Sequence, residues 1–247
     1  MSSGCQVSVK SFCFNPFREN SYLLCDEVGG ECVFVDPGCY DEAESEALKS
    51  FVSSHGLKPN AIWLTHGHFD HIFGVASLAR DYSIPVHMSS EDKMILRRDP
   101  VYAQGVGLKA PDVSFETEDL VDGQILRFAL RQAQDDKVVI LNDSEESPGF
   151  RVIATPGHTP GGVCFYSEEN KILFSGDTLF AGSIGRTDLD GGDYDKEIVG
   201  IMEKLMLLPG DVEVYPGHGP STSIAEERTT NPFLQPFNEP WENEIDL

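Results

Sequence analysis

The chain has 247 residues, and 41 acidic residues against 18 lysines and arginines give it a formal net charge of −23. This length suits one large domain or two small ones, and an apolar content of 40% excludes a disordered chain. A surface this acidic repels phosphate backbones and anionic bilayers, so we expect neither nucleic acid nor a membrane as a partner.

Cysteine usage and the N-terminus bear on the cellular compartment. The chain opens without the basic and apolar regions of a signal peptide, and no apolar run approaches the length of a membrane span. Its six cysteines lack CxxC spacing and mostly lie in apolar segments, which is typical of reduced thiols. We therefore expect a cytoplasmic protein, and the sequence leaves its oligomeric state open.

The N-terminal half begins with short strands and then alternates strands with helices. Apolar runs between turn residues predict strands over residues 5–14, 20–25, 32–36, 61–64 and 85–88. Helical spacing and composition predict helices over residues 41–55, 72–80 and 90–98. The glycines of residues 101–111 predict a loop.

The C-terminal half repeats this order after an ambiguous segment. A turn at residues 119–123 leads into a strand at 124–128, and residues 129–149 form either an added hairpin or a surface excursion. Further elements follow: strands over 150–154, 163–166, 171–174 and 212–215, and helices over 194–207 and 224–228. We predict one α/β domain, with two facing sheets, helices outside and an acidic surface tail at residues 232–247.

The most informative stretch is Thr65-His66-Gly67-His68-Phe69-Asp70-His71, between a predicted strand and a predicted helix. Three of the seven histidines of the chain crowd here beside an aspartate. Imidazole nitrogens and carboxylate oxygens are the ligands that zinc, iron and manganese accept. The pattern favours a metal site over a surface loop, whereas His55 and His87 lack ligand spacing and are expected to be structural or surface residues.

Three later loops place a ligand-type residue beside glycine where a predicted strand ends. They contain His158, Asp177 and His218. Each loop alone is ordinary turn chemistry, but together they bring ligands to strand ends, where α/β folds gather their sites. Asp36 also follows a strand and has either a turn role or a role in orienting ligands. The pair Arg186 and Asp188 forms either a local ion pair or a support for the Asp177 loop.

This set of residues resembles the metallo-β-lactamase-fold hydrolases. The stretch Gly182–Asp188 and the segment from Gly217-His218-Gly219-Pro220 to Asn231-Pro232-Phe233 resemble the short glyoxalase II branch. The resemblance implies an αββα sandwich that binds two zinc ions per chain, with iron or manganese as alternatives. It assigns His66, His68 and His158 to one ion, Asp70, His71 and His218 to the other, and Asp177 to a bridge between them.

The resemblance further implies hydrolysis of a small-molecule acyl thioester by a hydroxide that bridges the metals. Asp70 and Asp177 are the carboxylates that it assigns to catalysis. Only 29 residues follow His218, fewer than the helical domain with which two-domain glyoxalase II enzymes contact glutathione. We therefore expect thioester hydrolysis with weak recognition of the glutathione moiety.

A second function from another reaction class remains open. Persulfide dioxygenases share this fold and a similar Gly-Arg-Thr-Asp stretch, but they use one iron held by two histidines and an aspartate. Here those ligands would be His66, His158 and Asp177, a set that leaves open positions on the iron. The number and kind of bound metal ions separate the two hypotheses.

Overall fold

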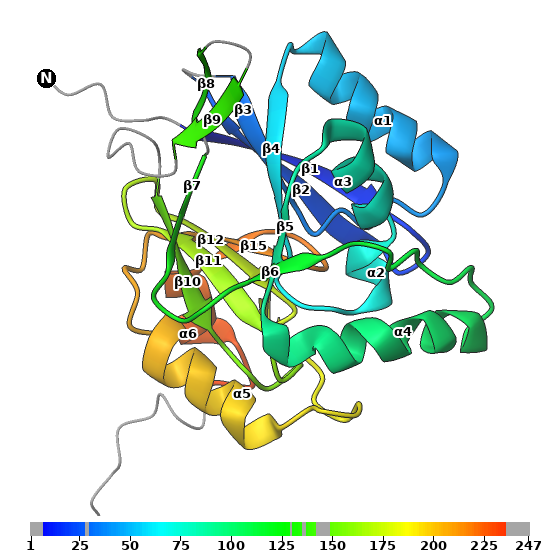
Figure 1. Cartoon of the computed structure of the whole chain (residues 1–247). Helices are drawn as coiled ribbons and strands as arrows, with labels where there is room; N and C mark the ends of the chain where they lie inside the picture. The colour runs from blue at the N-terminus through cyan, green and yellow to red at the C-terminus, as the bar shows by residue number, and fades with distance from the viewer. Residues whose placement is uncertain (1–6, 28–29, 129, 135–136, 142–148, 236–247) are drawn as a thin grey trace, which may run out of the picture.

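A computed structural model describes residues 7–27, 30–128, 130–134, 137–141 and 149–235 (Figure 1). Its N-terminal sheet runs in the order β1 (Val7–Phe14), β2 (Glu19–Asp26), β3 (Glu31–Val35), β4 (Lys58–Trp63), β5 (Val86–Met88) and β6 (Thr117–Asp119). The first three strands pair antiparallel and the last four pair parallel. Helices α1 (Glu42–Ser54) and α3 (Val75–Tyr82) make the connections between parallel strands.

The C-terminal sheet has the order β16 (Thr222–Ser223), β15 (Glu213–Pro216), β12 (Ile172–Gly176), β11 (Val163–Ser167), β10 (Gly149–Ala154) and β7 (Ile125–Arg127). Its helices are α5 (Tyr194–Gly200), which continues as a π-helical turn (Ile201–Leu205), and α6 (Ile224–Thr230). Two short strands, β13 (Leu179–Phe180) and β14 (Ser183–Ile184), form a separate hairpin.

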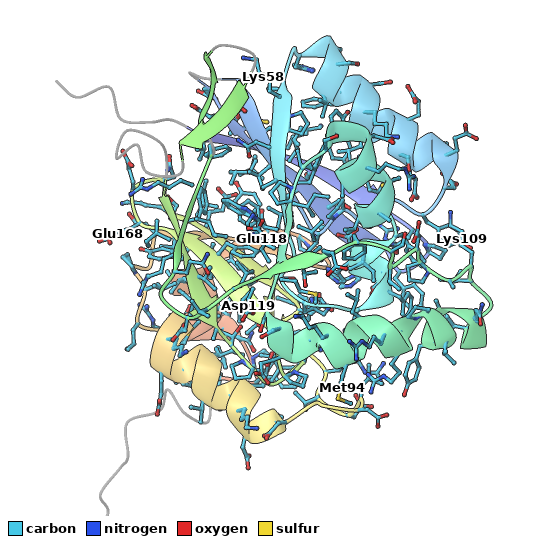
Figure 2. All side chains as sticks on the ribbon, in the orientation of Figure 1. Lys58, Met94, Lys109, Glu118, Asp119 and Glu168 are labelled. Carbon is cyan, nitrogen blue, oxygen red and sulfur yellow. The ribbon has the colours of Figure 1, made fainter. Side chains whose placement is uncertain are left out.

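Successive side chains of a strand lie on opposite faces of the sheet, because side chains alternate along an extended chain. Leu24 and Trp63 of the N-terminal sheet share a buried cluster with Phe165 of the other sheet. Leu23, which precedes Leu24 in the sequence, lies in a different cluster, with α1 and α3. A third cluster joins the outer face of the C-terminal sheet to α5 and α6. Side chains fill the space between these layers (Figure 2), and the predicted αββα sandwich is confirmed.

The predicted loop at residues 101–111 is wrong in its first part, because helix α4 (Lys93–Gly105) continues through Pro100. A proline inside a helix removes a hydrogen bond and costs about 3 kcal/mol. Here Leu96, Asp99 and Ala103 are buried at helical spacing. Their packing outweighs the cost of the proline.

Other differences are smaller. The predicted helix at 72–80 is two helices, α2 (Phe69–Ile72) and α3, and strand β6 was not predicted. The hairpin alternative holds for part of residues 129–149, where β8 (Leu130–Gln134) pairs antiparallel with β9 (Lys137–Leu141). The expected tail begins too early, because Leu234 is fully buried, and residues 236–247 lie outside the described part. None of the described helices is long and apolar enough to cross a bilayer.

Candidate metal centre

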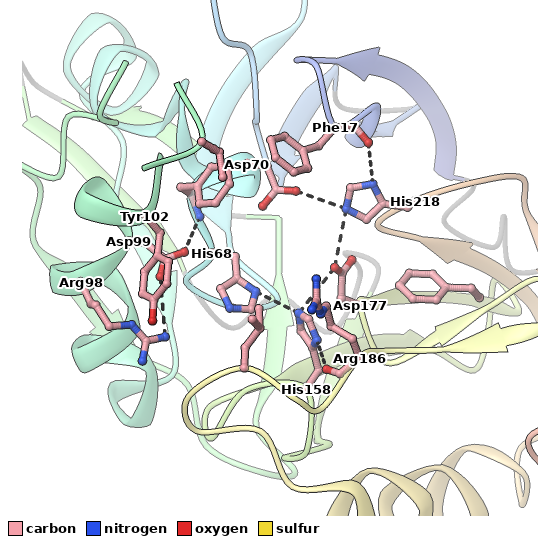
Figure 3. A pocket seen from close by; sticks show the side chains of 14 residues that line it. Phe17, His68, Asp70, Arg98, Asp99, Tyr102, His158, Asp177, Arg186 and His218 are labelled. Carbon is pink, nitrogen blue, oxygen red and sulfur yellow. Dashed lines mark hydrogen bonds and ion pairs between the residues drawn. The ribbon is translucent and has the colours of Figure 1, made fainter. Parts of the chain in front are cut away.

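Four loops that carry predicted ligands meet at one edge of the sandwich. They follow β4, β10, β12 and β15, and the last three strands run in the same direction, so their carboxyl ends share one edge. All seven predicted ligands lie in this region: His66, His68, Asp70, His71, His158, Asp177 and His218. Figure 3 shows five of them around one cleft.

The ligand atoms form two sets. One combines His66, His68 and His158, and the other combines Asp70, His71 and His218; within each set the atoms lie within 4.8 Å of one another. In the first set, Nδ1 of His68 is 2.9 Å from Nε2 of His158. In the second, Nε2 of His218 is 3.3 Å from Oδ2 of Asp70. Each spacing is compatible with side chains that converge on one ion.

Asp177 lies between the two sets. Its Oδ2 is 3.5 Å from Nε2 of His158 and 3.6 Å from Nε2 of His218. Its Oδ1 is 3.4 Å from Nε2 of His71. One carboxylate therefore faces both sets, which is the position that a bridging ligand requires.

In His158 and His218 the second ring nitrogen is held from behind. Nδ1 of His158 donates to the carbonyl of Arg186 over 2.7 Å, and Nδ1 of His218 donates to the carbonyl of Phe17 over 3.2 Å. These bonds place the proton on Nδ1 and turn Nε2 toward the centre. Such contacts orient the ring and raise the basicity of the ligand nitrogen.

Asp36, which follows β3, contacts the predicted ligand His71. Its buried Oδ2 accepts hydrogen bonds from Nδ1 of His71 at 3.1 Å and from Oγ1 of Thr65 at 2.5 Å, while Oδ1 accepts the Thr65 amide at 2.7 Å. Its backbone has a φ of +47°, a left-handed conformation that aspartate tolerates better than most residues. The alternative in which Asp36 orients ligands therefore has direct geometric support.

Unsatisfied buried atoms show that the residues fit a metal. Within the described chain, Nε2 of His66, Nε2 of His71 and Oδ1 of Asp177 have no hydrogen-bond partner. Buried polar atoms are nearly always paired, so unpaired atoms on three predicted ligands fit a site that a bound ion would complete. Burial also lowers the pKa of His66 and takes that of His68 to about 3, which keeps both rings in the neutral form that binds metals.

The electrostatics of the second set also favour a cation. Burial by itself lowers the pKa of His71, but the Asp177 and Asp70 carboxylates outweigh burial and raise it. Burial would raise the pKa of Asp177, and His71 in turn outweighs it and lowers the pKa. The carboxylates therefore create a potential that positive charge stabilises, and a divalent ion supplies that charge more fully than one imidazolium.

Two glycines are required by the close approach of the loops. A Cβ on Gly217 would lie 2.2 Å from Oδ1 of Asp177 and 2.7 Å from Cε1 of His71. A Cβ on Gly185 would lie 1.9 Å from the Asp177 carbonyl oxygen and 3.0 Å from Cβ of His158. The first three of these distances are shorter than real carbon contacts, so a side chain at either position would displace a ligand loop.

Buried carboxylates that the sequence analysis did not single out hold the ligand loops together. Asp92 accepts hydrogen bonds from the amide of Gly67 (2.9 Å), from Oγ1 of Thr159 (2.8 Å) and from the amide of Gly161 (2.6 Å). It therefore ties the loop of His66 and His68 to the loop of His158. Its sequence context, Ser89-Ser90-Glu91-Asp92, resembles an ordinary helix start and contains no signal for this role.

Glu197 supports the same region from α5. Its Oε2 accepts the amide of His158 over 2.8 Å. Burial raises the pKa of Glu197 to about 8. In the sequence this glutamate belongs to an amphipathic helix, and only the folded chain brings it behind a ligand.

The side chains of Arg186 and Asp188 form the predicted local ion pair, and a support for the Asp177 loop stays a prediction. The two exposed side chains form a bidentate local pair, with both N–O distances at 2.8 Å, while the backbone carbonyl of Arg186 holds His158. The two histidines without ligand spacing lie elsewhere. His55 ends α1, and Nδ1 of His87 is 3.5 Å from Oε2 of Glu118.

The fold and this centre define a class: αββα proteins with a histidine and aspartate metal site at one edge of the sandwich. Residues 14–218 match the Metallo-beta-lactamase superfamily, and the chain belongs to that family. It is 34% identical over 227 residues to "Probable metallo-hydrolase YqgX" of Bacillus subtilis, a match that covers 90% of this chain and 95% of the relative. It is also 34% identical over 224 residues to "Hydroxyacylglutathione hydrolase GloC" of Haemophilus influenzae. This match covers 88% of this chain and 93% of the relative.

Solved structures agree with this membership. TTHA1623 in a di-iron-bound form has a TM-score of 0.76 and 36% identity, covering 91% of this chain and 100% of that one. BLEG-1, a B3 metallo-beta-lactamase, has a TM-score of 0.75 and 34% identity, covering 92% and 99%. ETHE1 from Myxococcus xanthus has a TM-score of 0.68 over 91% of this chain and 83% of that one, and at 23% identity it shares the fold.

Proposed function

We propose that the protein is a binuclear metal-dependent hydrolase of small acyl thioesters, with zinc as its metal. The observation that carries the proposal is Asp177, whose carboxylate faces two separate ligand sets at 3.4–3.6 Å. One set would be enough for a single ion, and seven ligand-type residues exceed the needs of a closed structural zinc site. The 34% identity to a hydroxyacylglutathione hydrolase supports thioesters as the substrate class.

In this proposal His66, His68 and His158 would hold one ion, Asp70, His71 and His218 would hold the other, and Asp177 would serve both. Such a pair of ions supplies Lewis acidity and lowers the pKa of bound water to about 7.

The chain's own residues keep the ligands oriented. Asp36 holds the Nδ1 proton of His71, and the Arg186 carbonyl holds that of His158. Because these protons are held on the outer nitrogens, the imidazoles present Nε2 without rearrangement. A cytoplasmic location belongs to the same proposal and rests on the five described cysteines, which are all unpaired.

The test combines metal analysis with kinetics. Protein reconstituted with excess zinc and then desalted is expected to contain two equivalents of zinc and to hydrolyse a panel of thioesters that includes S-lactoylglutathione. Ester and lactam substrates with the same acyl groups serve as controls for the reaction class. Absence of thioester cleavage by protein that holds two zinc ions would refute the proposed function.

The persulfide dioxygenase hypothesis is a distinct outcome of the same test. It requires one iron on His66, His158 and Asp177, and it leaves the second ligand set without a role. The geometric support for a second set, with Nε2 of His218 at 3.3 Å from Oδ2 of Asp70, favours the hydrolase. Recovery of one equivalent of iron, together with oxygen consumption in the presence of a persulfide, would decide for the dioxygenase.

A further inference from the structure

The ligand loops open into a cleft of about 420 Å³ whose walls are rich in apolar side chains. Around the metal ligands lie six apolar or aromatic side chains: Phe17, Phe69, Tyr102, Val106, Phe180 and Leu189. Several are exposed, including Phe17 at 44% and Val106 at 58%. Exposed apolar side chains gathered at a candidate active site are typical of a surface that binds an apolar ligand.

Part of this apolar wall is held in place by ring contacts. Phe17 and Phe69 meet edge to face, with ring centroids 5.2 Å apart, and Phe69 meets Phe73 in the same way at 5.8 Å. The Phe180 ring lies 6.3 Å from the His218 ring. These contacts come from different segments of the chain, so the wall is formed before any ligand arrives and binding immobilises few side chains.

Each arginine of the cleft has a carboxylate partner. Arg186 is in its bidentate pair with Asp188, and NH1 of Arg98 lies 3.2 Å from Oδ2 of Asp190. The Arg98 guanidinium also stacks on the Tyr102 ring at 4.9 Å. Arg98 and Tyr102 lie across the cleft from His218 (Figure 3). An anionic substrate group would compete with these carboxylates for either arginine, which reduces the gain from binding there.

We propose that the cleft selects thioesters whose acyl chain is uncharged and apolar, and that Phe180 and Tyr102 are the residues that contact this chain. The inference rests on the proposed function, because it assumes that a thioester carbonyl is brought to the ligands beside His68, His158 and His218. Burial of one methylene is worth up to a factor of about four in affinity. An acyl chain with four further methylenes is therefore expected to raise the affinity at least about tenfold, even with partial burial.

Binding to inert analogues tests this selectivity without any turnover. The probes are amides of acetate, hexanoate and succinate on an N-acetylated ethylenediamine, in which nitrogen replaces the thioester sulfur. Calorimetry on the zinc-loaded protein is expected to give at least tenfold tighter binding of the hexanoyl amide than of the acetyl amide. The succinyl amide is expected to bind no more tightly than the acetyl amide.

Variants then assign the selectivity to residues. Phe180→Ala and Tyr102→Ala are each expected to reduce the preference for hexanoyl over acetyl by threefold or more, while binding of the acetyl amide changes little. Tyr102 is 42% exposed, so its truncation leaves folding intact. Leu207→Ala is the control, because Leu207 is 77% exposed and does not line the cleft. Asp190→Asn removes the carboxylate nearest to Arg98, keeps the bonds of Arg98 to the backbone carbonyl of residue 190, and is expected to tighten binding of the succinyl amide.

Three results would overturn the inference: equal affinity for the acetyl and hexanoyl amides, tighter binding of the succinyl amide by the unmodified protein, or an unchanged preference in both aromatic variants. The proposed function fails separately. If the hexanoyl amide binds with the expected preference but neither the acetyl nor the hexanoyl thioester is hydrolysed, the cleft is an apolar site of a protein with another activity.

Discussion

Asp92 offers a direct test of how the metal centre is held together. Its carboxylate accepts three hydrogen bonds from two ligand loops and is fully buried. In Asp92→Asn the amide group replaces one acceptor oxygen with a donor, so at least one of the three donors loses its partner. An unsatisfied buried donor costs about 1–3 kcal/mol.

The size of the expected loss follows from two opposing effects. Bonds to a carboxylate are worth more than bonds to a neutral amide, which adds to the cost of the substitution. Burial, however, raises the pKa of Asp92, so the ionised form already carries a desolvation penalty that asparagine avoids. We therefore expect Asp92→Asn to lower the free energy of unfolding by about 2 kcal/mol. Zinc affinity is expected to fall by about 10–100-fold, as for other groups that orient ligands.

Urea unfolding of the metal-free protein and competition with a zinc chelator measure these two losses. Asp119→Asn is the matched control, because Asp119 accepts two hydrogen bonds from Ser90 at an exposed position. Its stability is expected to change by less than about 0.5 kcal/mol, with zinc affinity unchanged. If Asp92→Asn binds zinc as tightly as the control variant, the ligand loops do not depend on this carboxylate and the reasoning is refuted.

Four further predictions follow from the centre. Reconstituted protein is expected to hold two equivalents of zinc per chain by elemental analysis, and one equivalent would contradict the two-set arrangement. Asp177→Ala is expected to abolish hydrolysis more completely than Asp36→Ala, for which a loss of about 10–100-fold is expected; comparable residual activity in the two variants would refute the bridge. Steady-state kinetics are expected to give a higher KM for S-lactoylglutathione than for a neutral thioester of the same acyl group, with kcat less affected; the opposite order of KM would reveal an anion site. Burial raises the pKa of Asp99 to about 7, so this carboxyl binds a proton in the folded metal-free protein but not in the unfolded chain between pH 4 and 7, and its contribution to stability falls as pH rises through that window. Urea unfolding of Asp99→Asn is expected to show a shallower fall over this window, and parallel pH curves would refute the assignment.

Local sequence carried most of the information about the ligands themselves. His66, His68, Asp70 and His71 are close in the chain, so a strand-to-helix loop brings them together without any long-range knowledge. His158, Asp177 and His218 were each found from a strand end followed by glycine, and the sandwich brings the three strand ends to one edge.

The supports of the centre could not be predicted in this way. Asp92 and Glu197 contact ligand loops 67 and 39 positions away in the chain, and their own surroundings resemble ordinary helix segments. The cleft could not be predicted from the sequence for a related reason. Tyr102 belongs to a segment that was predicted as a loop from its glycines, whereas α4 continues through Pro100 to Gly105.

The first ligand set spans the two sheets, since His66 and His68 follow a strand of one and His158 follows a strand of the other. When the two sheets part, this set is broken, so unfolding of the loaded chain releases the metal in the same event. The histidines involved are about 90 positions apart, and contacts of such long range form late in folding. Bound metal then slows unfolding more than it speeds folding. The rate at which the loaded protein loses its metal to excess chelator therefore measures how fast the two sheets separate.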